Sequence, residues 1–107
     1  MDLNTYQQKA LTTARDEGVE LMHRVLGLIG EAGEIAEKLK KWQRDDKADP
    51  AKLDKEALAK ELGDVLWYVA TLADHLGYSL DEIGRTNVDK LASRAARDKI
   101  KGSGDNR

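Results

Sequence analysis

Residues 30–39, with the sequence GEAGEIAEKL, decide how this chain is expected to fold. The segment has the pattern of a helix, although it contains two glycines and three glutamates. Because successive residues of a helix are turned by about 100°, Glu31 and Glu34 are neighbours on one helix surface. An interior glycine costs about 0.8–1 kcal/mol relative to alanine, and neighbouring like charges repel. Helix propensity alone therefore does not favour this sequence.

Residues 61–68, with the sequence ELGDVLWY, repeat the arrangement, because Glu61 and Asp64 are again an acidic pair three positions apart. Two such pairs on two helices are what a carboxylate metal site in a helix bundle requires. Glu61 also lies at the border of the apolar stripe of its helix, where an unpaired carboxylate would be costly. A bound cation would remove that cost.

The composition predicts a small all-α protein, and the expected helices make the fold four-helix-bundle-like. The 107 residues are 40% hydrophobic and 36% charged, with one proline and no phenylalanine. This length is enough for one modest core but not for two. We expect a single domain over residues 1–100 and a disordered tail over residues 101–107.

Capping signals and apolar periodicity divide the chain into expected helices. Asn4 and Gln7 resemble a capping box, and residues 79–82 (SLDE) resemble another. The expected helices cover residues 5–15, 19 to 42 or 44, 50–76 and 80–97. Apolar stripes run along the second and third of them: Leu21, Met22, Val25, Leu28, Ile29, Ala32, Ile35, Ala36 and Leu39, then Leu58, Leu62, Val65, Leu66, Val69, Leu72 and Leu76.

Several classes of protein are disfavoured by what the chain lacks. It contains no cysteine, which removes disulfides and thiolate zinc sites. It has no apolar run of the roughly 20 residues that span a bilayer, and its first residues do not form a signal peptide. A net charge of -2 argues against nucleic acid as the partner. We expect a soluble, cytoplasmic protein that binds neither membranes nor nucleic acid.

The acidic residues offer oxygen ligands only, which select Mg²⁺, Mn²⁺ or Ca²⁺ over zinc. We expect Mg²⁺, with Mn²⁺ as an alternative. Because Mg²⁺ is usually bound through a few carboxylates and the phosphates of a substrate, such a site indicates a phosphorylated substrate. Cationic and aromatic side chains suited to that substrate follow the acids. Candidates to neutralise phosphate oxygens are Lys38, Lys41, Lys90 and Arg94, and candidates to stack on a base are Trp42 and Tyr68.

Each of these residues also has a simpler interpretation. An acidic pair on one helix is often a solvated face, Lys38 and Lys41 could pair with Glu34, and the aromatic residues could belong to the core or an interface. Glu20 and His23 have the spacing of one half of a di-iron site. That alternative is weak, because the residue three positions before His75 is a leucine.

The acid quartet with its flanking sequence resembles the MazG-like all-α nucleoside triphosphate pyrophosphohydrolases. The family signature, E-x-x-E on one helix and E-x-x-D on the next, matches residues 31–34 (EAGE) and residues 61–64 (ELGD). The similarity spans residues 26–94 and includes GLIGEAGE, KELGDVLWY, and then Asn87, Lys90, Leu91 and Arg94.

The resemblance implies hydrolysis of a (d)NTP between its α and β phosphates, with Mg²⁺ held by Glu31, Glu34, Glu61 and Asp64. It also implies that Lys38 and Lys41 lie near the phosphates, Trp42 near the base, and Asn87 and Lys90 at the pocket margin. Members of the family assemble as dimers or tetramers that share helices. The base, the sugar and the pathway stay open. The alternative is a non-catalytic helical oligomerisation or regulatory module.

Overall fold

The computed structural model describes residues 1–15 and 18–97 of the chain, and all regular structure in these ranges is helical. The tail expected over residues 101–107 lies outside the described residues. The all-α prediction is therefore confirmed for the described part. The elements are α1 (Leu3–Leu11), α2 (Glu20–Asp46), the 3₁₀ turn η1 (Pro50–Lys52), α3 (Lys55–His75) and α4 (Leu80–Ala96).

Most helix ends follow from local sequence signals. The capping box predicted at residues 79–82 is present, since the Ser79 hydroxyl accepts from the Glu82 amide and the Glu82 carboxylate accepts from the Ser79 amide. Before it, Gly77 has φ 85°, a conformation that suits glycine and ends α3. The predicted start of α3 at Pro50 is wrong. Pro50 begins only the short turn η1, and the Asp54 side chain caps α3.

The boundaries predicted for the first helix are also wrong. Asp2 caps α1 by accepting from the Thr5 amide, so the helix starts before residue 5. It ends at Leu11, where the hydroxyls of Thr12 and Thr13 donate to backbone carbonyls of the last turn. The capping box predicted from Asn4 and Gln7 is not formed. The Asn4 side chain binds the Asp81 amide of α4, and the Gln7 side chain binds α3, the turn before α4, and the first residue of α4.

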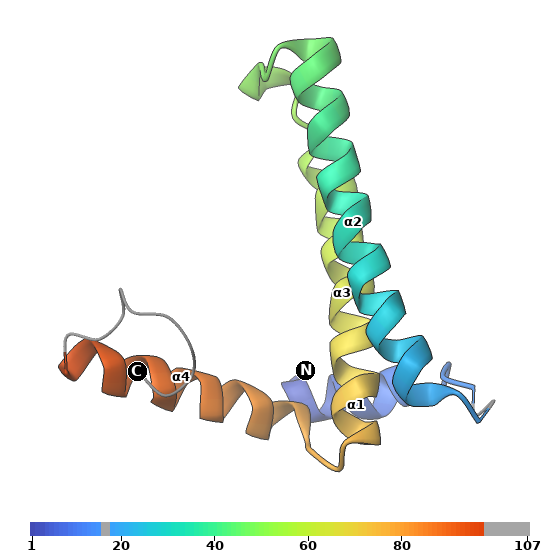
Figure 1. Ribbon diagram of the computed structural model, residues 1–107, viewed down its shortest axis with the longest axis vertical. Coiled ribbons are helices and arrows are strands. Elements are labelled where there is room, and N and C mark those ends of the chain that lie inside the picture. Colours follow the sequence, from blue (N-terminus) through green and yellow to red (C-terminus); the bar gives the residue numbers. More distant parts are fainter. Residues whose placement is uncertain (16–17, 98–107) are drawn as a thin grey trace.

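Helices α2 and α3 form a long antiparallel hairpin, and α1 lies across its open end (Figure 1). Helix α4 starts beside α1 and α3 and then leads away from the hairpin. The bundle-like packing expected from the sequence is therefore not closed within one chain. No helix of the described residues combines the length and the apolar character needed to cross a membrane.

The buried core is small and lies where α1, α3 and α4 meet. Ala10, Ala70 and Leu80 form its centre. Gln7, only 2% exposed, ties the three helices together: its amide nitrogen donates to the carbonyls of Ala70 and Tyr78 at 3.0 and 3.1 Å, and its oxygen accepts from the Leu80 amide at 3.0 Å. Both the nitrogen and the oxygen of this buried amide therefore have hydrogen-bond partners, as buried polar groups require.

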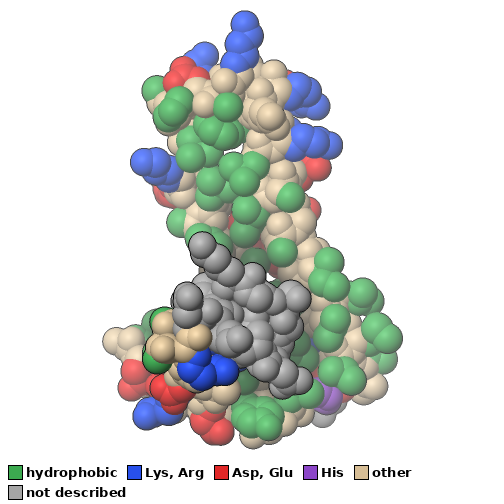
Figure 2. All heavy atoms as spheres, turned by 60° about the vertical axis from the view of Figure 1, so that its left-hand side comes forward, with side chains coloured by type: hydrophobic (Ala, Val, Ile, Leu, Met, Phe, Trp, Pro, Cys, Tyr) green, Lys and Arg blue, Asp and Glu red, His purple; other side chains and the backbone are tan. Residues whose placement is uncertain are grey.

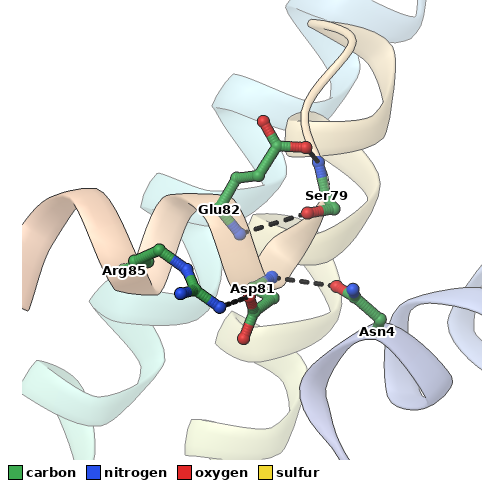
Figure 3. A network of polar contacts seen from close by, with 5 residues as sticks. All are labelled: Asn4, Ser79, Asp81, Glu82 and Arg85. Atoms are coloured by element: carbon green, nitrogen blue, oxygen red, sulfur yellow. Dashed lines mark hydrogen bonds and ion pairs between the residues drawn. The ribbon is translucent and has the colours of Figure 1, made fainter.

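A polar network at the surface reinforces this junction (Figure 3). The Asn4 side-chain oxygen accepts from the Asp81 amide at 3.0 Å, which satisfies one of the free amides at the start of α4. Asp81 also pairs with Arg85 at 2.9 Å, one turn further along the helix. Helix α1 therefore sets the direction in which α4 leaves the hairpin.

The apolar stripes predicted from periodicity are only partly covered. The hairpin buries a single seam, so several of their large side chains face outward, as Figure 2 shows along the hairpin. Ile29 is 63% exposed and Leu62 is 59% exposed. Other exposed apolar side chains on the three longer helices, or at the C-cap of α3 in the case of Leu76, are Leu21, Met22, Leu26, Leu39, Leu66, Leu76, Ile83, Val88 and Leu91.

Candidate metal centre and its surroundings

Three of the predicted acidic residues converge at the middle of the hairpin. Glu31 comes from α2, and Glu61 and Asp64 come from successive turns of α3; one carboxylate oxygen of each lies within 4.8 Å of the others. The Mg²⁺–oxygen distance is about 2.1 Å, so two ligand oxygens on opposite sides of the ion lie roughly 4.2 Å apart. Small side-chain rotations would therefore bring these three oxygens around one cation, and the donor set suits a hard divalent ion.

The electrostatics around Glu31 are dominated by neighbouring negative charges. Burial raises the pKa of Glu31, and a hydrogen bond with Glu61 and the negative charges of Asp64 and Glu61 raise it further. Glu34 adds a smaller repulsion. The raised pKa of Glu31 shows that negative charges crowd this carboxyl. A bound cation would offset the repulsion between the carboxylates.

Glu34, the fourth predicted acid, is not part of this close group. It is exposed on α2, and its oxygens are not among the three that converge. It influences the group through its charge on Glu31. The structure therefore brings together three of the four acids and leaves the fourth at the edge.

Lys38 connects the acids to a cavity at the closed end of the hairpin. Its Nζ lies 3.8 Å from Glu61 Oε1, so it pairs with Glu61 of the acidic group and not with Glu34. The Glu61 side chain is only 17% exposed, as its position at the border of the apolar stripe predicted. The cavity beyond Lys38 has a volume of about 240 Å³ and is lined by Lys38, Lys41, Trp42, Asp45, Asp46, Lys52, Leu53, Asp54, Ala57 and Leu58.

The two aromatic candidates have clear packing roles. The Trp42 indole N–H donates to the Asp49 carbonyl at 2.8 Å and ties the connecting loop to α2. The Tyr68 ring lies directly against Gly27 of α2 and edge-on to Trp67, with ring centroids 5.0 Å apart. For Tyr68 this favours the packing interpretation that the sequence left open.

The residues predicted on α4 do not reach the acids of the same chain. Asn87, Lys90 and Arg94 lie on the helix that leads away from the hairpin (Figure 1). Arg94 is 3% exposed, and Asn87 is exposed. The di-iron alternative gains no support either, because the group of possible metal ligands among the described residues contains only carboxylates.

Two residues near the site were missed by the sequence analysis. Burial raises the pKa of the Tyr6 hydroxyl, and the charge of Asp64 raises it further, so α1 borders the acids. Arg24 is 6% exposed and lies over the Trp67 ring, 5.3 Å from its centroid. No local motif marks either residue, because both depend on how α1 crosses the hairpin.

Comparison with known proteins gives a family match over most of the chain. The family model of the MazG nucleotide pyrophosphohydrolase domain matches residues 20–97. The Gene 37 protein of Mycobacterium phage L5 is 43% identical over 114 residues, covering 100% of both chains. The uncharacterized protein YvdC of Bacillus subtilis strain 168 is 34% identical over 76 residues, covering 66% of this chain and 72% of its own. No solved structure matches significantly.

Proposed function

Because the chain belongs to the MazG nucleotide pyrophosphohydrolase family, we propose that it hydrolyses (d)NTPs between the α and β phosphates to a monophosphate and pyrophosphate. The observation that carries this proposal is the convergence of Glu31, Glu61 and Asp64 on one point of the hairpin. The raised pKa of Glu31 supports it, since neighbouring negative charges crowd this carboxyl.

In this proposal, Glu31, Glu34, Glu61 and Asp64 hold Mg²⁺, or Mn²⁺ in its place. The bound ion would offset the phosphate charge and lower the pKa of a bound water, the nucleophile of the reaction. The carboxylates orient this water toward the α or β phosphorus. We propose that Glu34, which is exposed and acts on Glu31 through its charge, completes the ligand set when a cation is bound.

Lys38 and Lys41 are proposed to bind phosphate oxygens. Both line the cavity next to the acids, and Lys38 already contacts Glu61. A cation bound by Glu61 would repel the Lys38 ammonium, which leaves it available for the negatively charged substrate. Trp42 also lines this cavity and is proposed to face the nucleotide there, although its indole N–H already donates to the Asp49 carbonyl.

The protein is proposed to act as a homo-oligomer, a dimer or a tetramer. The exposed apolar side chains of the hairpin and α4 would be covered in such an assembly, which removes their contact with water. Asn87 and Lys90, on the helix α4 that leads away from its own hairpin, are proposed to border the acids of a neighbouring chain, whereas Arg94 is buried within its own chain. The proposed cellular role is control of the nucleotide pool or removal of aberrant nucleotides in the cytoplasm.

The test is to incubate the protein and Mg²⁺ with each common ribo- and deoxyribonucleoside triphosphate and to separate the products by ion exchange. Monophosphate and pyrophosphate support the proposal, whereas diphosphate and orthophosphate would refute cleavage between the α and β phosphates. Glu61→Gln should abolish turnover without loss of helicity. Glu56→Gln is the matched control, because Glu56 is exposed on the same helix and pairs only with Lys60 among the described residues.

If no triphosphate is cleaved and Mg²⁺ does not bind, the non-catalytic oligomerisation or regulatory module is the better interpretation. Mn²⁺ binding, measured through the paramagnetic effect of the ion on water relaxation, distinguishes the enzyme from the non-catalytic module. The module interpretation predicts no difference between the wild type and Glu61→Gln in that measurement.

A further inference from the structure

The cavity at the closed end of the hairpin has lysines on two of its walls. Lys38 and Lys41 belong to α2, whereas Lys52 belongs to η1, the turn that connects α2 to α3. Lys52 was not among the residues predicted from the sequence. Within residues 1–15 and 18–97, neither Lys41 nor Lys52 forms an ion pair. Two of the three lysines that line the cavity are therefore available to an anionic ligand.

Most of the acidic residues in the lining are already engaged. The Asp45 carboxylate accepts two hydrogen bonds from the Arg44 guanidinium, at 2.7 and 3.1 Å. The Asp54 carboxylate accepts from the Ala57 amide at 3.0 Å and caps α3. Asp46 is the third acid of the lining. Because three lysines accompany these carboxylates, an anion suits the cavity better than a neutral group, which would displace water from the ammonium groups without compensating their charge.

The loop that carries Lys52 is held against α2 by hydrogen bonds. The Trp42 indole N–H donates to the Asp49 carbonyl at 2.8 Å, and the same carbonyl accepts from the Lys52 amide at 3.0 Å. The Asp49 carboxylate accepts from the Ala51 amide at 3.0 Å, which caps the turn. The backbone of Lys52 therefore has a defined place in the cavity wall, and its exposed side chain is long enough to turn toward a ligand.

The order of the lysines along the hairpin relates the cavity to the acids. Side chains on a helix tilt toward its N-terminus, so the lysines of α2 lean from the closed end toward the acids. The contact of Lys38 Nζ with Glu61 at 3.8 Å agrees with this direction. Lys41 follows one helical turn later, and Lys52 lines the same cavity. A polyphosphate that starts at the acids and runs toward the closed end would meet Lys38 first, and then Lys41 and Lys52.

We propose that the closed-end cavity binds the β and γ phosphates of the substrate, and that Lys52 contacts the γ phosphate. The inference rests on the proposed function, since it assumes that the bond between the α and β phosphates lies at the acids. The β and γ phosphates carry most of the negative charge of a nucleoside triphosphate, and they leave together as pyrophosphate. The Trp42 ring then borders the polyphosphate part of the nucleotide. Lys52 thereby makes the site select triphosphates over nucleotides with a shorter phosphate chain.

The first test compares inhibition by the two products in Lys52→Gln, with the triphosphate that the wild type cleaves fastest as substrate. Inhibition by pyrophosphate should weaken about tenfold, because a charged hydrogen bond is lost, and inhibition by the monophosphate should not change. Lys55→Gln is the matched control. Lys55 is an exposed residue three positions later that does not line the cavity, so this variant should leave both inhibition constants unchanged. Weakened inhibition by the monophosphate, or unchanged inhibition by pyrophosphate, in Lys52→Gln would overturn the proposal.

The second test does not depend on turnover. Inorganic pyrophosphate is titrated calorimetrically, in the presence of Mg²⁺, into the wild type and into Lys52→Gln, and the variant should bind it about tenfold more weakly. This result with no triphosphate cleaved would support the phosphate site and refute the proposed reaction. Cleavage of triphosphates with equal pyrophosphate affinity of the two proteins would refute the role of Lys52 alone. If neither cleavage nor pyrophosphate binding is detected, both proposals are wrong.

Discussion

The ring of Tyr68 occupies the space that a side chain at Gly27 would need. A Cβ built at Gly27 would collide with several ring atoms of Tyr68. Because Gly27 has no side chain, α3 can approach α2 closely at this point. Gly27 lies one turn before Glu31 on α2, and Tyr68 lies one turn after Asp64 on α3. This contact sets the spacing of the hairpin next to the acids.

Gly27→Ala should destabilise the protein by about 1–3 kcal/mol, because overpacking outweighs the gain in helix propensity. Gly30→Ala is the control. Nothing lies within 4 Å of a Cβ at Gly30. That variant should instead stabilise the helix by up to about 1 kcal/mol. Urea unfolding followed by circular dichroism measures both changes, and equal effects of the two variants would contradict the packing role of Tyr68.

The pH dependence of the metal-free protein should report the crowding of the acids. The pKa of Glu31 is raised above 4.5, so the folded state binds its proton more tightly than the unfolded chain does. The stabilisation is fully present below the unfolded pKa and is lost as the pH rises through the higher native value. Glu31→Gln should flatten this part of the profile. Thermal unfolding at a series of pH values, without metal, checks the sign; a rise in stability over this range would contradict it.

Metal affinity should change with pH in the opposite sense. The proton on Glu31 competes with the cation, so Mn²⁺ should bind more weakly as the pH falls toward and below the native pKa of this carboxyl. Calorimetric titration at several pH values, in buffers of different ionisation enthalpy, should detect proton release on binding. Binding without proton release near that pKa would show that Glu31 is not a ligand.

Removing the charge of Lys38 should affect substrate binding more than stability. The ion pair with Glu61 is partly exposed, so Lys38→Gln should change the free energy of unfolding by no more than about 1 kcal/mol. Loss of a charged hydrogen bond to phosphate should raise KM about tenfold or more. Lys40→Gln is the control, because Lys40 is exposed and pairs with Glu37. Unchanged steady-state kinetics in Lys38→Gln would remove Lys38 from the phosphate site.

The junction of α1, α3 and α4 should depend strongly on Gln7. Gln7→Ala removes three hydrogen bonds and leaves buried backbone groups without partners, at a cost of about 2–4 kcal/mol. Ser79→Ala, which removes only a helix cap, should cost about 1 kcal/mol. Denaturant unfolding of the two variants gives the comparison. A smaller loss for Gln7→Ala than for Ser79→Ala would contradict the role assigned to the buried amide.

The sequence by itself determined the features that depend on neighbours along the chain. The approximate range of α2 follows from apolar periodicity, and the start of α4 follows from the capping box of Ser79 and Glu82. The acidic pairs on α2 and α3 are visible as spacing, and their flanking residues identified the family that the comparisons show. The partly buried position of Glu61 could also be predicted, since it lies at the border of an apolar stripe.

Only the tertiary structure decided the features that join distant segments. Gln7 and Asn4 have the spacing of a local cap, yet they bind groups more than sixty residues away, where buried and terminal amides lack other partners. Periodicity identifies the apolar face of a helix but not the part of that face that the hairpin buries. Ile29 and Leu62 lie on the predicted apolar faces and are nevertheless exposed. The direction of α4 and the burial of Arg24 depend on where α1 crosses α3. That crossing is set by packing between segments far apart in the sequence, which no local pattern records.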